Sequence, residues 1–405
     1  MKPIVRAGRM KPVHSDIRGP LFVEAMKRQK QGIDILKLNT GNPATFGFGL
    51  PDSIKNALME HMQDGVGYCD FKGMPQARQA ICDYETSKGI NGITSDDVFI
   101  GNGVSEVVSF ALTPLLNDGD EVLVPSPSYS LWGNSVYLED GKPVFYTCDE
   151  QANWYPDIKD IRSKITDKTK AIVIINPNNP TGVLYPKELL LEIIQIARES
   201  GLLIFADEIY DRLVMDGKQH ISLASLTEDV PVITLNGLSK SHCLCGYRCG
   251  WMVISGPREL TEDYRQGIIQ LTSLRLCANT MAQIVIPAAL DDMETPASMV
   301  RPGGRIYEQR EATVRELEKI DGLSFVKNDA AFYVFPKLDV KKFNITNDKQ
   351  FAHDLLDATN ILLVPGSGFD WKDPDHFRIV MLPQADILSD AIRRMGTFLD
   401  GYKQK

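Results

Sequence analysis

The middle of the chain alternates between short apolar runs and longer helical segments, and this alternation restricts the fold more than any other feature. The runs are rich in β-branched and aromatic residues, and helical stretches such as 105–116 and 187–200 separate most of them. The seven runs lie at 97–101, 121–125, 143–147, 171–176, 202–207, 232–236 and 250–255. Strands that alternate with helices form βαβ units, so the sequence predicts an α/β fold with a mostly parallel, seven-stranded sheet.

The chain has 405 residues, which is more than one hydrophobic core usually organises. Residues 1–50 contain a short helix and a short strand and end in a Gly/Pro/Phe-rich stretch, so we expect an N-terminal arm that belongs to a small domain. Residues 51–295 carry the predicted sheet and form the expected large domain. Residues 296–405 combine helices with short strands, which predicts a smaller C-terminal α+β domain.

Composition favours a protein that acts on small molecules. The formal net charge is −9, which argues against nucleic acid or an anionic membrane as the main partner. Seven scattered cysteines suggest no disulfide framework, and the Cys243, Cys245 and Cys249 group lacks the spacing of a zinc site, so no metal is predicted. The N-terminus has no apolar signal region and no run is long enough to span a membrane, so we expect a cytoplasmic protein.

Polar sequences follow four of the predicted strands directly. They are 101–105, 176–182, 207–210 and 236–240. Ligands of open α/β sheets bind beyond the carboxyl ends of the strands, so four such endings indicate one common site. The stretch 101–105 precedes a helix and offers free backbone N–H groups to an anion, although a plain helix cap by Ser105 is the alternative.

Three charged residues near these ends have both a functional and an ordinary interpretation. Lys240 could be a nucleophilic amine, although most lysines at strand ends are simply solvated. Asp207 ends a strongly apolar strand and would need a cationic partner if buried; Glu208 could be the functional acid instead, or both could cap the next helix. Arg248 could bind a phosphate with two hydrogen bonds, or it could be a surface arginine.

Taken in order, these residues resemble the signature of class I/II aminotransferases, the aspartate-aminotransferase-like, fold type I group of pyridoxal-5′-phosphate (PLP) enzymes. The signature consists of Asn179-Pro180-Thr181-Gly182, Asp207-x-x-Tyr210, Ser239-Lys240, Arg248 and Gly250-Trp251. The resemblance extends from Gly41-Asn42-Pro43 to the Arg378 segment. Each part is weak alone, but the ordered set is specific.

The resemblance implies a role for each matching residue toward PLP. Lys240 would hold the cofactor as an imine and later move the proton between the substrate α-carbon and the cofactor. Asp207 would pair with the pyridine nitrogen, and Tyr210 and Asn179 would bind the 3′ oxygen. Tyr129 would stack on the ring, unless it is an ordinary core tyrosine. The phosphate would be held by Gly103, Val104, Ser105, Ser239 and Arg248.

The resemblance also implies substrate contacts and a partner subunit. Arg378 and the backbone of Gly41 would bind the substrate α-carboxylate, and an arginine in an apolar strand does need an anionic partner. Tyr68 would reach the phosphate in the neighbouring subunit, which implies a homodimer. The Asn179–Pro180 peptide would be cis.

The amino-acid sequences of segments such as DIRGP (16–20) and GYCDFKG (67–73) are most similar to those of bacterial glutamate–pyruvate (alanine) aminotransferases. Their reaction needs one site that accepts both a methyl side chain and a side chain with a carboxylate. Arg18 is our first candidate for binding that side-chain carboxylate, and Arg275 is the second candidate. Arg18 could also be a surface residue. Ser15, Cys243 and Cys245 depart from that group, where Tyr, Arg and Ala are usual. Alternatives are an aspartate, aromatic or broad-specificity aminotransferase, or a C–S lyase or decarboxylase on the same fold.

Overall fold

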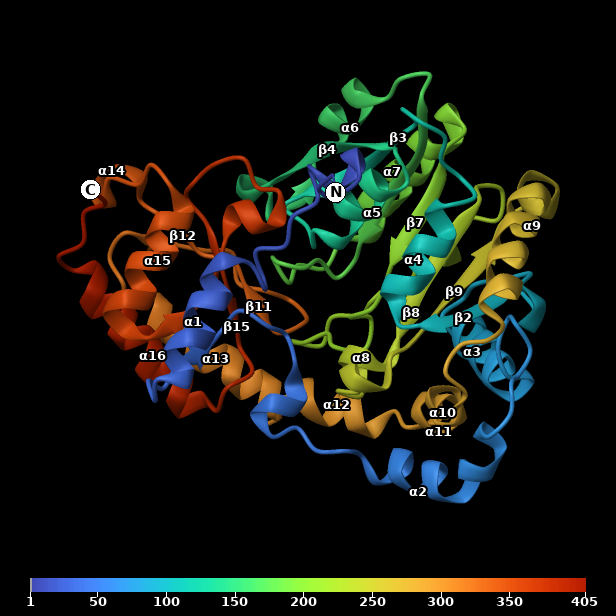
Figure 1. The fold of residues 1–405 in the computed structure, drawn as a ribbon, viewed down its shortest axis with the longest axis horizontal. Coiled ribbons are helices and arrows are strands. Elements are labelled where there is room, and N and C mark those ends of the chain that lie inside the picture. Colours follow the sequence, from blue (N-terminus) through green and yellow to red (C-terminus); the bar gives the residue numbers. More distant parts are fainter. Residues whose placement is uncertain (1) are drawn as a thin grey trace.

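Eight strands form one sheet at the centre of the computed structural model, which describes residues 2–405 (Figure 1). In spatial order they are β2 (Val98–Asn102), β9 (Cys249–Ser255), β8 (Val232–Gly237), β7 (Leu203–Asp207), β6 (Thr169–Ile175), β3 (Glu121–Ser126), β4 (Lys142–Asp149) and β5 (Tyr155–Pro156). The strands from β8 to β4 are parallel, whereas β9 and β5 are antiparallel to their neighbours. The mostly parallel sheet is confirmed, with one strand more than predicted. The additional β5 has two residues, too few for a recognisable pattern.

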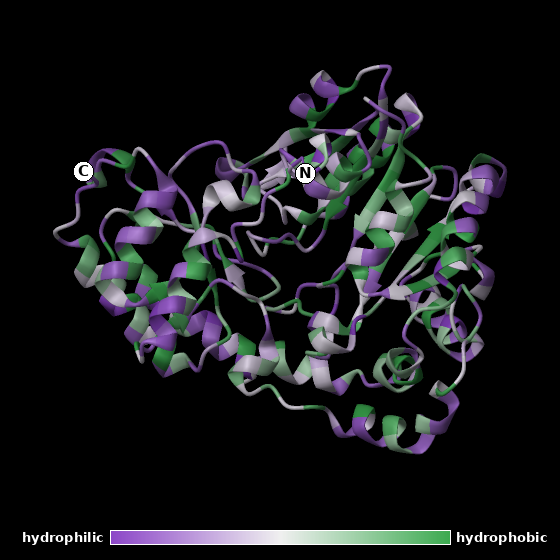
Figure 2. Ribbon diagram, in the orientation of Figure 1, coloured by the Kyte–Doolittle hydropathy of each residue, from purple (hydrophilic) through white to green (hydrophobic). Residues whose placement is uncertain are grey.

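Helices cover both faces of this sheet, which explains why its strands are apolar throughout. In β6, Ala171, Val173 and Ile175 join one buried cluster and Ile172 and Ile174 join another, because successive side chains point to opposite faces. The first face is covered by α4 (Val104–Leu112), α5 (Leu131–Leu138) and α9 (Arg258–Arg275), and the second by α6 (Ile158–Lys164) and α7 (Lys187–Ser200). Figure 2 accordingly shows hydrophobic strands in the middle of the sheet.

Three further helices flank the antiparallel end of the sheet. They are α3 (Pro75–Ser87), α10 (Thr280–Ile284) and α11 (Ile286–Asp291), which share a buried cluster with β2 and β9. The remaining helices of this region are α2 (Asp52–His61), α8 (Leu238–Ser241) and α12 (Glu294–Val300). Across residues 2–405, no single helix has both the length and the apolar composition needed to cross a membrane. Helix α9 together with α10 and α11 reaches that length and composition, but the two parts are bent by 119° relative to each other.

The N-terminal and C-terminal segments pack together beside the sheet, with α1 (Pro20–Lys30) among the C-terminal helices in Figure 1. Strand β1 (Leu36–Lys37) pairs in parallel with β13 (Ile361–Leu362), which explains how the arm joins the end of the chain. The other elements are β10 (Leu323–Ser324), β11 (Tyr333–Val334), β12 (Lys337–Leu338), β14 (Val364–Pro365), β15 (Phe377–Val380), α13 (Arg305–Leu317), α14 (Val340–Phe343), α15 (Asp348–Thr359) and α16 (Ala385–Leu399). Most of these elements contribute to one buried cluster, whereas Val364 of β14 packs with the cluster of the large sheet.

The prediction that the Asn179–Pro180 peptide is cis is wrong. The cis bonds precede Pro127 and Pro177, and the Asn179–Pro180 bond is not among them. That bond lies inside a single turn in which the Gly182 N–H donates to the Asn178 carbonyl at 2.8 Å. The Asn179–Pro180 bond therefore takes the trans form, which is the ordinary one for a peptide.

Candidate active site

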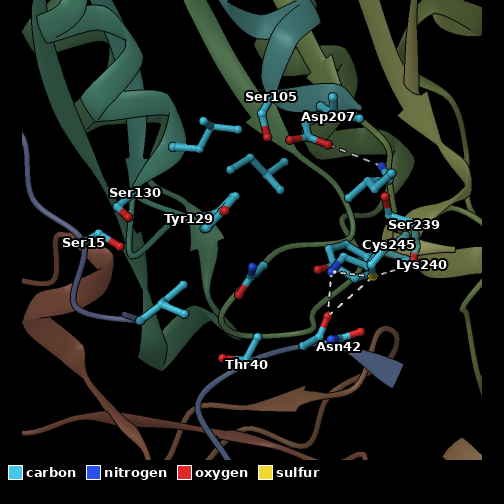
Figure 3. A pocket seen from close by; sticks show the side chains of 18 of the residues that line it. Ser15, Thr40, Asn42, Ser105, Tyr129, Ser130, Asp207, Ser239, Lys240 and Cys245 are labelled. Atoms are coloured by element: carbon cyan, nitrogen blue, oxygen red, sulfur yellow. Dashed lines mark hydrogen bonds between the residues drawn. The ribbon is translucent and has the colours of Figure 1, made fainter. Parts of the chain in front are cut away.

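The polar strand endings meet in one cavity of about 840 Å³ at the carboxyl edge of the sheet (Figure 3). Its walls combine segments that are far apart in the chain, namely the arm, the endings of β6, β7 and β8, the start of α4, and strands β11 and β15. Of the predicted site residues, the cavity is lined by Arg18, Gly41, Val104, Ser105, Tyr129, Asn179, Asp207, Tyr210, Ser239, Lys240, Arg248 and Arg378. Only Gly103 and Tyr68 are outside this lining.

Lys240 lies on the short helix α8, directly after β8, and its ammonium is buried in the cavity. The Nζ atom donates to the Gly41 carbonyl at 2.9 Å and lies 5.8 Å from the centre of the Phe332 ring. Burial alone would lower its pKa, but the surrounding Tyr333, Cys245 and Tyr129 raise the pKa of Lys240 above its ordinary value. The lysine therefore rests as an ammonium and must lose a proton before it can act as a nucleophile.

Asp207 ends β7 with its carboxylate buried at the floor of the cavity. The Trp132 indole N–H donates to it at 3.0 Å and the Ile209 N–H at 3.4 Å. Burial raises the pKa of Asp207 to about 6, so this carboxylate is still ionised at neutral pH. The two groups that donate hydrogen bonds to it are both neutral. Glu208, the alternative acid, instead bonds to Lys88 and Ser222, each at 2.8 Å, and does not line the cavity.

Beside Asp207, the start of α4 and Arg248 form a cradle with the chemistry of an anion site. The first N–H groups of a helix have no partner within the helix and carry its positive dipole end. Gly103 caps α4 with φ 83°, and a Cβ atom there would collide with the Arg248 guanidinium, so only glycine allows the close approach. Arg248 donates to the Cys245 carbonyl at 3.0 Å and has no ion pair within residues 2–405. Ser105 and Ser239 complete the cradle.

Arg378 is a buried guanidinium whose partners are all neutral. It lies in β15 with 1% of its surface exposed, donates to the Asn179 side-chain oxygen at 2.9 Å and also to the Asn39 carbonyl. Its Nε atom has no partner in the part of the chain that the structure describes, and burial lowers the pKa of Arg378. A buried cation without an anion is destabilising, so an anion that entered the cavity would find a partner here.

Three cavity contacts were not predicted from the sequence. Tyr333 on β11 shares a 2.9 Å hydroxyl–hydroxyl hydrogen bond with Tyr210, Trp132 on α5 binds Asp207, and Cys245 lies 3.9 Å from the Lys240 nitrogen. Tyr333 and Trp132 occur in apolar segments and look like ordinary core residues in the sequence. Cys245 was noticed only as a departure from related sequences.

The N-terminal arm is fixed across the mouth of the cavity by His14 and Asn134 on α5. Two backbone-to-amide bonds join them, at 3.1 and 2.6 Å, and the His14 ring also contacts Asp370 at 3.0 Å. This anchor places Arg18 in the cavity lining, where it is exposed and has no ion pair with residues 2–405. Arg275, the reserve candidate, instead pairs with Glu106 at 2.6 Å and lies outside the lining, because α9 directs it behind α4.

The anchor predicts a pH dependence of stability. The neighbouring carboxylates of Asp16 and Asp370 raise the pKa of His14 from 6.5 to about 9. Because the folded-state value is the higher one, the stabilisation is complete below pH 6.5, declines above it and is lost above about pH 9. We expect His14→Gln to lower the thermal unfolding midpoint at neutral pH, and the gap to wild type to close by about pH 10. A gap that stayed constant over this range would contradict the ion pair.

Tyr68 does not reach the cavity of its own chain. Its side chain is 84% exposed. Apolar side chains of α2, of the segment after it and of the end of α9 are exposed as well, namely Met59, Met62, Val66, Leu274 and Leu276.

The cavity therefore combines a buried amine, an ionised carboxylate, an anion cradle and an unpaired guanidinium on an α/β fold. Residues 33–392 match the family described as aminotransferase class I and II, and the chain belongs to this family. It is 50% identical over 404 residues to the glutamate-pyruvate aminotransferase AlaA of Haemophilus influenzae, with 100% of both chains covered. It is 45% identical to an alanine aminotransferase of Mycobacterium tuberculosis, covering 100% of this chain and 94% of the relative. A crystal structure of an aminotransferase from Escherichia coli superimposes with a TM-score of 0.98 at 47% identity over 100% of both chains.

Proposed function

We propose that this chain uses PLP to transfer the amino group of glutamate to pyruvate, which yields 2-oxoglutarate and alanine. The observation that carries the proposal is Arg378, a buried guanidinium without an anionic partner, in the same cavity as Lys240. Every substrate of this reaction has a carboxylate next to the reacting carbon, and Arg378 is placed to bind it with two hydrogen bonds. The high identity to enzymes named for this reaction supports the choice of substrates.

The residues present fit PLP. The cradle of Gly103, Val104, Ser105, Ser239 and Arg248 has the donors and the positive charge that a phosphate dianion requires. The ionised Asp207 forms no ion pair with residues 2–405 and would pair with a protonated ring nitrogen. When bound, PLP supplies an aldehyde that exchanges amino groups and a pyridine ring that accepts electrons.

The chain itself supplies positioning and proton transfer. Arg378 and Gly41 hold the substrate carboxylate, which directs the α-carbon toward Lys240. The Lys240 nitrogen would take the proton from the substrate α-carbon and return it to the C4′ carbon of the cofactor. Asn179 is held by a 2.9 Å hydrogen bond from Arg378, and Tyr210 by a 2.9 Å hydrogen bond to Tyr333. Their polar side chains would bind the 3′ oxygen of the cofactor ring. Tyr129 lies on the cavity wall where an aromatic ring can stack.

The same site must accept both a methyl group and a second carboxylate. Arg18 is exposed and has no ion pair with residues 2–405, so water can solvate it while alanine is bound, and it can pair with the side chain of glutamate. A buried arginine at this position would be left without a partner by alanine. The exposure of Arg18 therefore suits a dual-substrate site.

Arg18→Ala is expected to discriminate between the two substrates. The kcat/KM for glutamate should fall roughly tenfold, the loss of one exposed charge-assisted hydrogen bond, and the value for alanine should change less than about twofold. Half-reactions with each amino acid measure the two values separately. Equal losses for both would show that Arg18 supports the arm rather than the side-chain carboxylate.

The proposal includes a homodimer in which Tyr68 contributes to the phosphate site of the partner. The exposure of Tyr68 and of the apolar side chains of α2 and of the segment after it supports this assembly. The division into an arm (1–50), a large domain (51–295) and a small domain (296–405) is also a proposal, supported by the cluster that most of the C-terminal elements share, although Phe335, Val364 and Phe369 pack with the sheet. The cytoplasmic location stays a prediction.

The proposal is tested by mixing the purified, PLP-loaded protein with alanine, glutamate or aspartate and recording the visible absorbance of the cofactor. Alanine and glutamate should each change the spectrum, and pyruvate or 2-oxoglutarate should restore it. A response to aspartate alone would favour an aspartate aminotransferase. Release of ammonia without restoration by an oxo acid would favour a lyase.

A further inference from the structure

Cys243 and Cys245 are two residues apart but face different surroundings. Cys243 adopts a left-handed conformation with φ 59°, and its sulfur lies 3.8 Å from the Met299 sulfur. Burial raises the pKa of this thiol to about 12, which leaves it inert. Cys245, at the start of the turn Cys245–Tyr247, instead lines the cavity beside Lys240 (Figure 3).

The geometry directs the sulfur lone pairs of Cys245 toward the lysine. The thiol donates its proton to the Ser239 carbonyl at 2.9 Å, so the proton is not available to Lys240. The Lys240 Nζ atom lies 3.9 Å from this sulfur and 2.9 Å from the Gly41 carbonyl. Within residues 2–405 these two atoms are its only hydrogen-bond acceptors, although a buried ammonium has three protons to donate.

We propose that Cys245 is the second acceptor of the free Lys240 ammonium and thereby sets the proton affinity of the catalytic amine. The inference rests on the proposed function, because Lys240 is free only while the amino group resides on cofactor or substrate. An acceptor near a buried ammonium favours its charged form, and sulfur does so more weakly than oxygen. A weak acceptor suits a group that must both take up and release a proton, since neither form is strongly trapped.

Other ionisable groups also face Lys240 from the surrounding elements. They are Asp207 on β7, Tyr129 before α5, Tyr333 on β11, Arg378 on β15 and Cys243 in the same loop. All of them remain in place when residue 245 alone is changed. A matched series at this position therefore isolates the contribution of the sulfur atom.

The test compares Cys245→Ala, Cys245→Ser and wild type, with Cys243→Ala as the control for loop structure. Competitive acetylation of the cofactor-free protein, read at the Lys240 peptide by mass spectrometry across pH, reports the pKa of the amine without any reaction. We expect the order Ala below Cys below Ser, with steps of about half a pH unit, and no shift in the control. The PLP-loaded proteins should show the same order in the pH midpoint of their half-reaction with alanine.

The inference would be overturned if wild type, Cys245→Ala and Cys245→Ser gave the same pH midpoint of Lys240 acetylation. It would also be overturned if Cys243→Ala shifted that midpoint as much as Cys245→Ala does. Failure of the proposed function has a different signature, because wild type would then not react with alanine at any pH. The acetylation order does not depend on that reaction, so the two failures are distinguishable.

Discussion

Replacing Lys240 with alanine is expected to reduce transamination by at least about 10⁴-fold. Lys240 is the one amine in the cavity lining, and its removal takes away both the attachment point of the cofactor and the group that moves the proton. Lys240→Arg should be equally inactive, because a guanidinium keeps the charge but cannot lose its proton. Alanine formation from glutamate and pyruvate measures the effect.

Lys218→Ala is a matched control for this loss. Lys218 forms an exposed ion pair with Asp329 at 2.6 Å, and such pairs contribute about 0–1 kcal/mol to stability. Its activity should equal that of wild type. Transamination by Lys240→Ala within about a hundredfold of wild type would show that another group moves the proton.

Replacing Arg378 with methionine is expected to lower kcat/KM for alanine and glutamate by roughly a hundredfold or more, and to a similar extent for both. The reason is that both substrates carry the α-carboxylate that Arg378 is placed to bind, and losing a buried charge pair of this kind costs about 2–5 kcal/mol. Arg378→Lys should recover only part of the loss, because lysine cannot form two parallel hydrogen bonds. Separate half-reactions with the two amino acids measure the effect.

The same substitution is expected to leave the free protein at least as stable as wild type. Arg378 is buried with neutral partners and an Nε atom that has none within residues 2–405, so methionine removes an unfavourable charge while filling the space between Tyr333 and Phe369. Thermal unfolding of the two proteins without amino acid provides the comparison. A large loss of stability would mean that the arginine has a structural role. A loss of activity with glutamate alone would mean that Arg378 binds the side-chain carboxylate of glutamate instead of the α-carboxylate.

The positions of the strands were predictable because each consists of a run of apolar residues buried on both faces. Helices cover both sides of β6 and β7, so residues 171–175 and 203–206 are all apolar and these runs stand out in the sequence. Strand β5 could not be found in this way, since its two residues pair only with the end of β4.

Most of the candidate site was also predictable, because parallel strands bring their carboxyl ends to one edge of the sheet. Asn179, Asp207 and Lys240 follow β6, β7 and β8, and the order of these strands places the three residues together. The choice between Arg18 and Arg275 was not decided by any such rule. It depended on how the arm packs against α5 and on the pairing of Arg275 with Glu106.

By itself the sequence predicted the class of fold, because the alternation of strands and helices is a local pattern. The lysine, the carboxylate that ends β7 and the arginine of β15 were predicted from the resemblance of the ordered motifs to a known family. Only the tertiary structure decided which neutral groups support them. The bonds from Trp132 to Asp207, from Tyr210 to Tyr333 and from Lys240 to Gly41 join residues 75, 123 and 199 positions apart. Such contacts arise from side-chain packing between elements, for which local sequence carries no signal.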